Sequence, residues 1–130
     1  MSWVEVFAVF CVSHAVGDFL LQTEFQAVHK RGGLGGDATA RRALLAHTLS
    51  YTHAFAPALA WIGGELGAAG VAAVAAGVAL PHCVQDDGRL IRAYTRAVKH
   101  ADPQPGMLML AVDQSFHLVV LFALAVAAAA

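Results

Sequence analysis

Long apolar stretches alternate with polar connections along this chain. The stretches cover residues 3–22, 43–62, 66–85 and 107–130. Each is about as long as the roughly 20 residues with which an α-helix crosses a bilayer. The third is built almost wholly from Ala, Gly and Val, and small residues let neighbouring helix backbones approach closely. The pattern predicts an all-α fold: a single domain, residues 1–130, forming a four-transmembrane-helix bundle.

The two longest connections differ in character. Residues 23–42 are polar and glycine-rich, so we expect a loop there. Residues 87–101 are basic and amphipathic, which predicts a short helix lying on the membrane surface between spans three and four. The basic residues that fall largely on its polar face, and that we expect to contact anionic lipid headgroups, are Arg89, Arg92, Arg96 and Lys99.

The composition supports a membrane protein. Hydrophobic residues make up 58% of the chain and charged residues 13%, with a mean hydropathy of +0.62. A soluble helical bundle is the alternative, but only the first stretch has anything like the polar outer stripe of a soluble helix. That first stretch carries Glu5, His14 and Asp18 and no basic segment before it, so we interpret it as a retained span and not as a signal peptide.

The basic residues indicate an orientation. In an up-and-down bundle, every Lys and Arg falls in the first or third connection, on one side of the membrane. The positive-inside rule places that side in the cytoplasm. We therefore expect a multi-pass protein of the bacterial inner membrane with both termini outside.

A histidine and an aspartate four residues apart occur three times. The pairs are His14 with Asp18, His82 with Asp86, and Asp113 with His117. A four-residue step returns to the same face of a helix, so each pair directs an imidazole and a carboxylate to one point. Such residues are costly at membrane depth, which favours a functional interpretation.

The predicted topology brings these pairs together. The end of span one, the start of span two, the end of span three and the start of span four share the basic side. The candidate metal ligands there are His14, Asp18, His47, His82, Asp86, Asp113 and His117. This set suits one or two divalent ions such as Zn²⁺, Mn²⁺ or Fe²⁺. A buried network of His–Asp hydrogen bonds without metal is the alternative.

Four further residues are candidates to hydrogen-bond to the ligands and so to orient them. They are Gln22, Gln114, Asp87 and Tyr51. Gln22 extends the face of the first pair, whereas Asp87 is also an alternative ligand to Asp86. Tyr51 lies one turn after His47 and is either a packed aromatic or a proton donor. His29, His53 and His100 lie outside the pattern.

Other chemistries fit the residues less well. A haem site would not explain the aspartates. The glycines of residues 32–36 do not follow a strand, so they are weak evidence for phosphate binding. Membrane topology and anionic lipid explain the basic stretches better than nucleic acid does.

The motifs as a set resemble a known family. The matching text is His14-Ala-Val-Gly-Asp18 followed by Phe-Leu-Leu-Gln22-Thr, then Leu45-Ala-His47, then His82-x-x-x-Asp86, then Asp113-Gln114-x-x-His117. In order and spacing this is similar to domain-of-unknown-function family 3307, which comprises membrane proteins of bacteria and phages. Family members often read Ile-Asp where this chain reads Gln85-Asp86-Asp87, which makes Asp87 the alternative to Asp86. A weaker likeness is to bacterial membrane-bound metal-dependent hydrolases.

Three functional hypotheses follow. The leading one is a membrane-embedded metal-dependent hydrolase acting on a lipid or other amphipathic substrate at the cytoplasmic leaflet, with an aspartate that is not a ligand as general base. The second is a component of metal-ion transport, which would require a homo-oligomer because four short spans are few. The third is a structural or phage-encoded interaction protein in which the metal only holds the bundle together.

Overall fold

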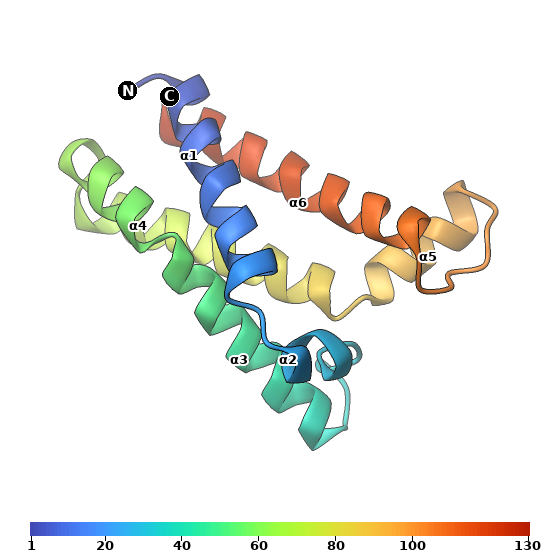
Figure 1. Ribbon diagram of the computed structural model, residues 1–130. Helices are drawn as coiled ribbons and strands as arrows, with labels where there is room; N and C mark the ends of the chain where they lie inside the picture. The colour runs from blue at the N-terminus through green and yellow to red at the C-terminus, as the bar shows by residue number, and fades with distance from the viewer.

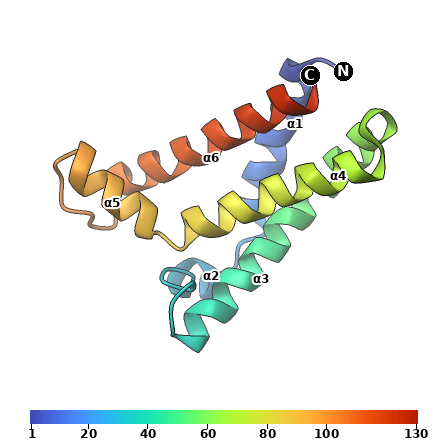
Figure 2. The same cartoon turned by 180° about the vertical axis from the view of Figure 1, so that it is seen from behind.

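The computed structural model describes residues 1–130 and contains helices only, which confirms the all-α prediction. Its elements are α1 (Trp3–Ala15), the π-helical η1 (Val16–Leu20), α2 (Glu24–His29), α3 (Ala38–Ala54), α4 (Ala56–Asp86), α5 (Arg89–Val98) and α6 (Met107–Ala128). Figures 1 and 2 show both termini together at one end of the molecule, with α2 and α5 toward the other. We call these the terminal end and the basic end.

Side chains just before the helices explain where several of them begin. Ser2 and Glu5 form a reciprocal capping box at the start of α1, and Thr23 and Gln26 form another at α2. Asp37 accepts a hydrogen bond from the backbone of α3. The prediction of an uninterrupted loop over residues 23–42 is therefore wrong, because capping allows a short helix within it.

Helix α4 is not straight. Gly67 has φ 66° and ψ −179°, a conformation that glycine adopts readily, and the chain turns back there, as Figure 1 shows. A second interruption separates α3 from α4 at Phe55. Pro57 lacks the N–H that would bond to the carbonyl of His53, so the helical ladder is broken just before it.

Three helical segments are long and apolar enough to cross a membrane: Trp3–Leu20, Ala56–Asp86 and Met107–Ala128. The expected second span, residues 43–62, is not one of them, because Phe55 divides it between α3 and α4. Four separate spans are therefore not confirmed by this count. α5 forms between α4 and α6 as expected, and it buries Ile91 and Thr95.

The main core lies toward the terminal end. It consists of Val6, Phe10, Tyr51, Phe55, Ala58, Ile62, Val74, Val78, Leu121, Ala125 and Ala128. Large apolar side chains elsewhere on the helices are exposed, for example Val12 at 65%, Leu80 at 68% and Val119 at 67%. An apolar exterior of this extent is suited to lipid contact. A cluster of His and Asp side chains lies between this core and the basic end.

Candidate metal centre

The π-helical stretch η1 carries Asp18. The N–H of Leu21 donates to the carbonyl of Val16 at 2.9 Å, a five-residue step in place of the usual four. Such stretches are rare in proteins overall, but those that occur are often found at functional sites. The preceding Gly17 lets η1 press against α3, because a Cβ at this position would lie 2.6 Å from Cδ2 of Tyr51. This close approach brings Asp18 to the histidine of α3.

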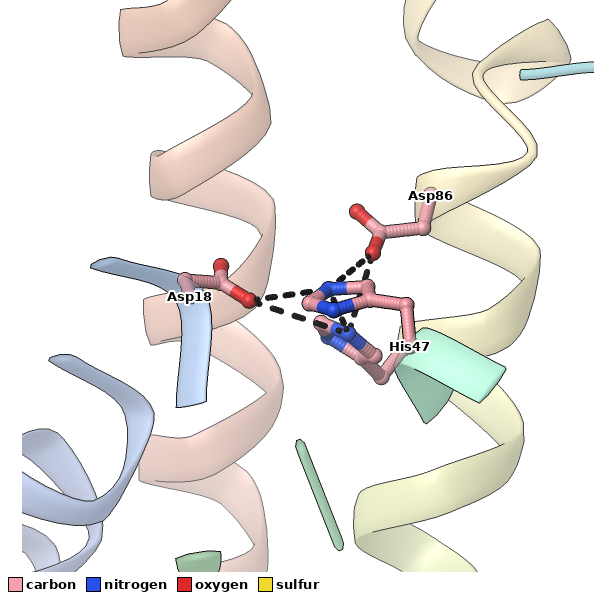
Figure 3. Close-up of side chains that lie close together, drawn as sticks. Asp18, His47 and Asp86 are labelled. Atoms are coloured by element: carbon pink, nitrogen blue, oxygen red, sulfur yellow. Dashed lines mark hydrogen bonds and ion pairs between the residues drawn. The ribbon is translucent and has the colours of Figure 1, made fainter. Parts of the chain in front are cut away.

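The first group of candidate ligands comprises Asp18, His47, His82 and Asp86. His47 Nε2 lies 2.8 Å from Asp86 Oδ2, 3.3 Å from Asp18 Oδ1 and 3.1 Å from His82 Nε2. His82 Nε2 lies 3.0 Å from Asp86 Oδ2 and 3.8 Å from Asp18 Oδ1. Figure 3 shows Asp18 and Asp86 approaching His47 from different sides. Side chains from η1, α3 and α4 thus converge on one point.

The spacing of these atoms fits a small cation. Ligands about 2.0 Å from a tetrahedral metal lie about 3.3 Å from one another. The separations that involve a histidine run from 2.8 to 3.8 Å, and all four ligand atoms lie within 4.8 Å of one another. Imidazole nitrogens and carboxylate oxygens that present lone pairs to one another repel unless a proton or a cation lies between them. Asp18 Oδ1 is moreover buried without a hydrogen-bond partner. The four residues present therefore fit a metal ion.

The second group comprises Asp86, Asp113 and His117. Nδ1 of His117 lies 2.8 Å from the backbone carbonyl of Asp113, so this nitrogen donates and Nε2 carries the lone pair. That Nε2 is buried without a hydrogen-bond partner and lies 3.8 Å from Asp86 Oδ1. Asp86 thus faces the first group with one oxygen and His117 with the other.

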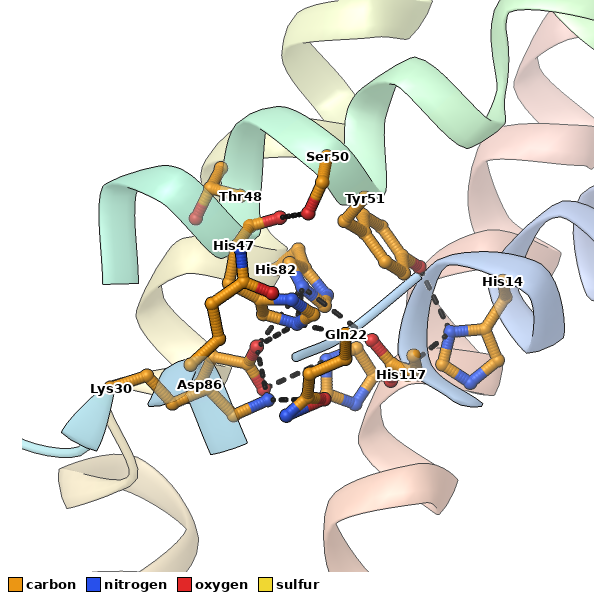
Figure 4. Close-up of polar contacts among 12 residues, drawn as sticks. His14, Gln22, Lys30, His47, Thr48, Ser50, Tyr51, His82, Asp86 and His117 are labelled. Atoms are coloured by element: carbon orange, nitrogen blue, oxygen red, sulfur yellow. Dashed lines mark hydrogen bonds and ion pairs between the residues drawn. The ribbon is translucent and has the colours of Figure 1, made fainter. Parts of the chain in front are cut away.

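His14 lies beside these groups and belongs to neither. Its Nε2 is 2.9 Å from Gln114 Oε1, an acceptor, so Nε2 carries the proton and Nδ1 accepts from the Tyr51 hydroxyl at 3.0 Å. The Gln114 amide then donates to Asp18 Oδ2 at 3.3 Å. This chain holds Asp18 with its other oxygen, Oδ1, toward His47. Figure 4 shows His14 engaged with Tyr51.

The imidazole of His82 is oriented by packing. The ring of Tyr51 stacks on His82 with centroids 3.4 Å apart and planes within 4°. Nδ1 of His47 and Nδ1 of His82 are buried without a partner, so neither ring has the acceptor that usually orients a metal-bound histidine. The stack on Tyr51 fixes His82 in place of such an acceptor.

Lys30 enters the site, although no sequence motif assigned it there. Its Nζ lies 2.8 Å from Asp86 Oδ2 and 3.2 Å from Gln22 Oε1, as Figure 4 shows. The ammonium group therefore stands next to an oxygen of the first group. The only sequence signal was its position on the basic side, because its placement depends on how the following loop is held.

Asp87 holds that loop and does not join the cluster. Its Oδ1 accepts from the N–H of Leu34 at 2.8 Å, its carbonyl accepts from Gly32, and its Oδ2 pairs with Arg89. Of the basic residues predicted on the polar face of α5, Arg96 and Lys99 are exposed, whereas Arg92 is half-buried and faces Gly88.

The site is closed toward one end and accessible toward the other. Tyr51, Phe55 and Phe10 stack edge-on or tilted beneath it, with centroids 5.1 and 5.6 Å apart, and they belong to the core of the terminal end. Toward the basic end, a cavity of about 160 Å³ reaches Asp18 and Asp113. Exposed Phe19 and Leu110 also line this cavity, so it opens beside the apolar surface.

No family model, no curated protein and no solved structure matches the chain. The resemblance to domain-of-unknown-function family 3307 therefore stays a prediction. Any functional assignment rests on the chemistry of the site.

Proposed function

We propose that the protein is a membrane-embedded, metal-dependent hydrolase acting on an ester or phosphoester bond of a lipid or other amphipathic substrate. One observation carries the proposal: the ligand atoms of two imidazoles and two carboxylates lie within 4.8 Å of one another beside a cavity that opens at the apolar surface. A ligand set that only held the bundle together would not need that cavity.

The donor set suits Zn²⁺, Mn²⁺ or Fe²⁺, because these ions accept mixed nitrogen and oxygen ligands. Asp18, His47, His82 and Asp86 would hold one ion. Asp86 Oδ1 faces His117 Nε2, so Asp86, Asp113 and His117 would be the residues to hold a second ion if one binds. With one ion or two, the bound metal supplies Lewis acidity and makes hydroxide accessible near neutral pH.

Residues of the chain other than the ligands of the first group would supply a general base and limit access of water to the site. Asp113 lines the cavity, and its side chain is 25% exposed, more than any carboxylate of the first group. With a single ion held by the first group, Asp113 would remain a free carboxylate able to act as general base toward a water molecule in the cavity. The aromatic side chains beneath the site keep water from reaching it from the terminal end.

A transport role is less well supported. A transported ion would need a path from the cluster to the terminal end, and the packed ladder of Tyr51, Phe55 and Phe10 occupies that route. These three side chains are at most 1% exposed. The arrangement favours a one-sided site, as a hydrolase of one leaflet requires.

The proposal includes a membrane topology. We infer that α3 and the part of α4 before Gly67 together form a second span, so that four spans surround the site. The basic end would face the cytoplasm of a bacterial cell, since all Lys and Arg residues lie in residues 30–42 and 89–99 at that end. The surface of α5 would contact anionic headgroups.

The test is metal-dependent turnover. Protein purified without chelator would be loaded with Zn²⁺, Mn²⁺ or Fe²⁺ and incubated with vesicles of phosphatidylcholine, phosphatidylglycerol and diacylglycerol. Product release would be followed by mass spectrometry. We expect hydrolysis that needs metal, is lost in His47→Ala and is retained in His53→Ala, a matched exposed histidine on the same helix. If the protein binds metal stoichiometrically but hydrolyses no ester or phosphoester, the hydrolase proposal is wrong and the role of the metal is structural.

A further inference from the structure

A cleft at the basic end is lined by three cations next to the proposed metal ligands. Lys30, Arg31 and Arg92 line it together with Asp86 and Asp113. The three cations come from separate parts of the chain, because Lys30 and Arg31 follow α2 and Arg92 lies on α5. The fold therefore brings them together at the site, whereas the sequence places them about 60 residues apart.

Two of these cations have no acidic partner. Lys30 pairs with Asp86, and on α5 it is Arg89 that pairs with Asp87. Arg31 and Arg92 form no ion pair and no side-chain hydrogen bond, although Arg92 is half-buried. A half-buried guanidinium group without a partner is a ready site for an anion.

Both arginines converge on Gly88. A Cβ at this residue would lie 3.0 Å from Arg92 Nη1 and 3.6 Å from Arg31 Cγ. Gly88 is buried and has φ +79°, so no side chain separates the two arginines. The guanidinium group of Arg92 and the aliphatic stem of Arg31 therefore both lie against the backbone of the turn between α4 and α5.

The charge balance selects an anionic ligand. Three cations face two carboxylates in the cleft, and a metal held by Asp86 would add further positive charge. The fork of a guanidinium group matches the oxygens of a phosphate. Lys30, Arg31 and Asp113 also line the cavity that opens beside Phe19 and Leu110. A phosphate in the cleft could therefore be joined to an apolar chain at that opening.

We propose that Lys30, Arg31 and Arg92 bind the phosphate group of an anionic phosphoester. As an assignment of the substrate class this rests on the proposed hydrolase, but binding itself can be tested without turnover. Arg96 and Lys99 are exposed further along α5, and neither lines the cleft. The headgroup contacts expected of these two residues need a bilayer surface, which a short-chain lipid in neutral detergent does not provide. They are therefore a matched control for diffuse attraction between positive charge and lipid.

The experiment measures binding to metal-free protein in a neutral detergent by isothermal titration calorimetry. The probes are dihexanoylphosphatidylglycerol and dihexanoylphosphatidylcholine, which share acyl chains but differ in net charge. We expect the wild type to bind the anionic lipid about tenfold more tightly, the effect of one charge-assisted hydrogen bond. The preference should disappear in R31Q/R92Q and persist in R96Q/K99Q, which removes the same charge.

The outcomes separate this proposal from the hydrolase. Equal binding of both lipids by the wild type would show that the three cations do not select an anionic phosphoester over a zwitterionic one and would overturn the proposal, and this comparison needs no variant to fold. An equal loss in R96Q/K99Q would also overturn it, by showing attraction to the surface alone. A preference for the anionic lipid without metal-dependent turnover would instead contradict the hydrolase proposal and support the phosphate-binding site. Competition by glycerol phosphate would assign the site to soluble phosphates, and its absence would assign it to lipid headgroups.

Discussion

At the scale of the residue, Asp86 is the centre of the site. It contributes to both groups of candidate ligands, and Lys30, His47 and His82 all approach its Oδ2 within 3.0 Å. A buried carboxylate needs such partners, because an unpaired charge is strongly disfavoured away from water. Asp113 is more exposed and belongs to the second group only, so the two aspartates should differ in their effect on metal binding.

We expect Asp86→Asn to lose all bound metal, since both groups lose a charged ligand. Asp113→Asn should keep the ion held by the first group and lose at most a second one. Elemental mass spectrometry of the purified proteins gives the number of ions per chain. A wild-type metal content in Asp86→Asn would contradict the assignment.

Substitution of Gln114 tests the chain of hydrogen bonds that runs from Tyr51 through His14 and Gln114 to Asp18. Gln114→Leu removes the donor to Asp18 Oδ2 and should weaken metal binding about 10- to 100-fold, the usual effect of losing a partner behind a ligand. Ser115→Ala is the control, because that exposed hydroxyl bonds only to the carbonyl of Ala111. Competition with a chromophoric chelator measures the affinity, and equal affinities in the two variants would refute a role for the chain.

At the scale of the element, close packing and short polar contacts place the ligands. η1 approaches α3 through Gly17, and the loop after α2 is held to the end of α4 by Asp87. The first contact sets the depth of Asp18, and the second sets the position of Lys30. Each can be weakened by a single substitution that leaves every candidate ligand in the chain.

Gly17→Ala should lower both stability and metal affinity. The added Cβ would lie 2.6 Å from Cδ2 and 3.2 Å from Cα of Tyr51, so η1 must move away from α3. Overpacking of this kind costs about 1–3 kcal/mol. Gly64→Ala is the control, because nothing lies within 4 Å of its Cβ position. Thermal unfolding in detergent compares them, and an unchanged Tm in Gly17→Ala would show that the contact is easily relieved.

Asp87→Ala should loosen the loop without removing a ligand. The N–H of Leu34 loses its acceptor, so its hydrogen exchange should accelerate, and Lys30 should lose its fixed position. Hydrogen exchange followed by mass spectrometry of peptides from residues 30–37 measures the effect. Asp102→Ala removes a carboxylate from another connection and should leave this exchange unchanged. Faster exchange in Asp102→Ala but not in Asp87→Ala would show that Asp87 does not anchor the loop.

At the scale of the whole molecule, charge and polarity are divided between two ends. The terminal end holds the apolar core and a single ion pair, between the N-terminal amine and Glu65 at 3.0 Å. The basic end holds all the lysines and arginines and the openings of the site. This division supports a protein that presents its site to one leaflet.

The orientation predicts which residues a membrane-impermeant maleimide reaches. In a background of Cys11→Ala and Cys83→Ala, Ser2→Cys should react from outside intact spheroplasts. Ala101→Cys should react only after the membrane is permeabilised, since it follows α5 at the basic end. Labelling of both positions from one side would contradict the four-span arrangement and its orientation.

Much of the fold and part of the site were predictable from local patterns. Apolar stretches of bilayer length identified the long helices, and the basic, amphipathic residues 87–101 identified α5. The four-residue spacing of His82 and Asp86 placed both side chains on one helical face. These features depend on helical periodicity and length, which any stretch of sequence displays by itself.

Only the tertiary structure decided how the polar residues are matched. His14 shares the spacing of His82, yet Tyr51 and Gln114 engage both of its nitrogens. Lys30 reaches Asp86 because Asp87 holds the loop that follows it. The sequence by itself determined the long apolar helices, the basic helix α5 and which residue types reach the basic end. Individual partners were decided by contacts between residues up to 100 positions apart, which no local pattern encodes.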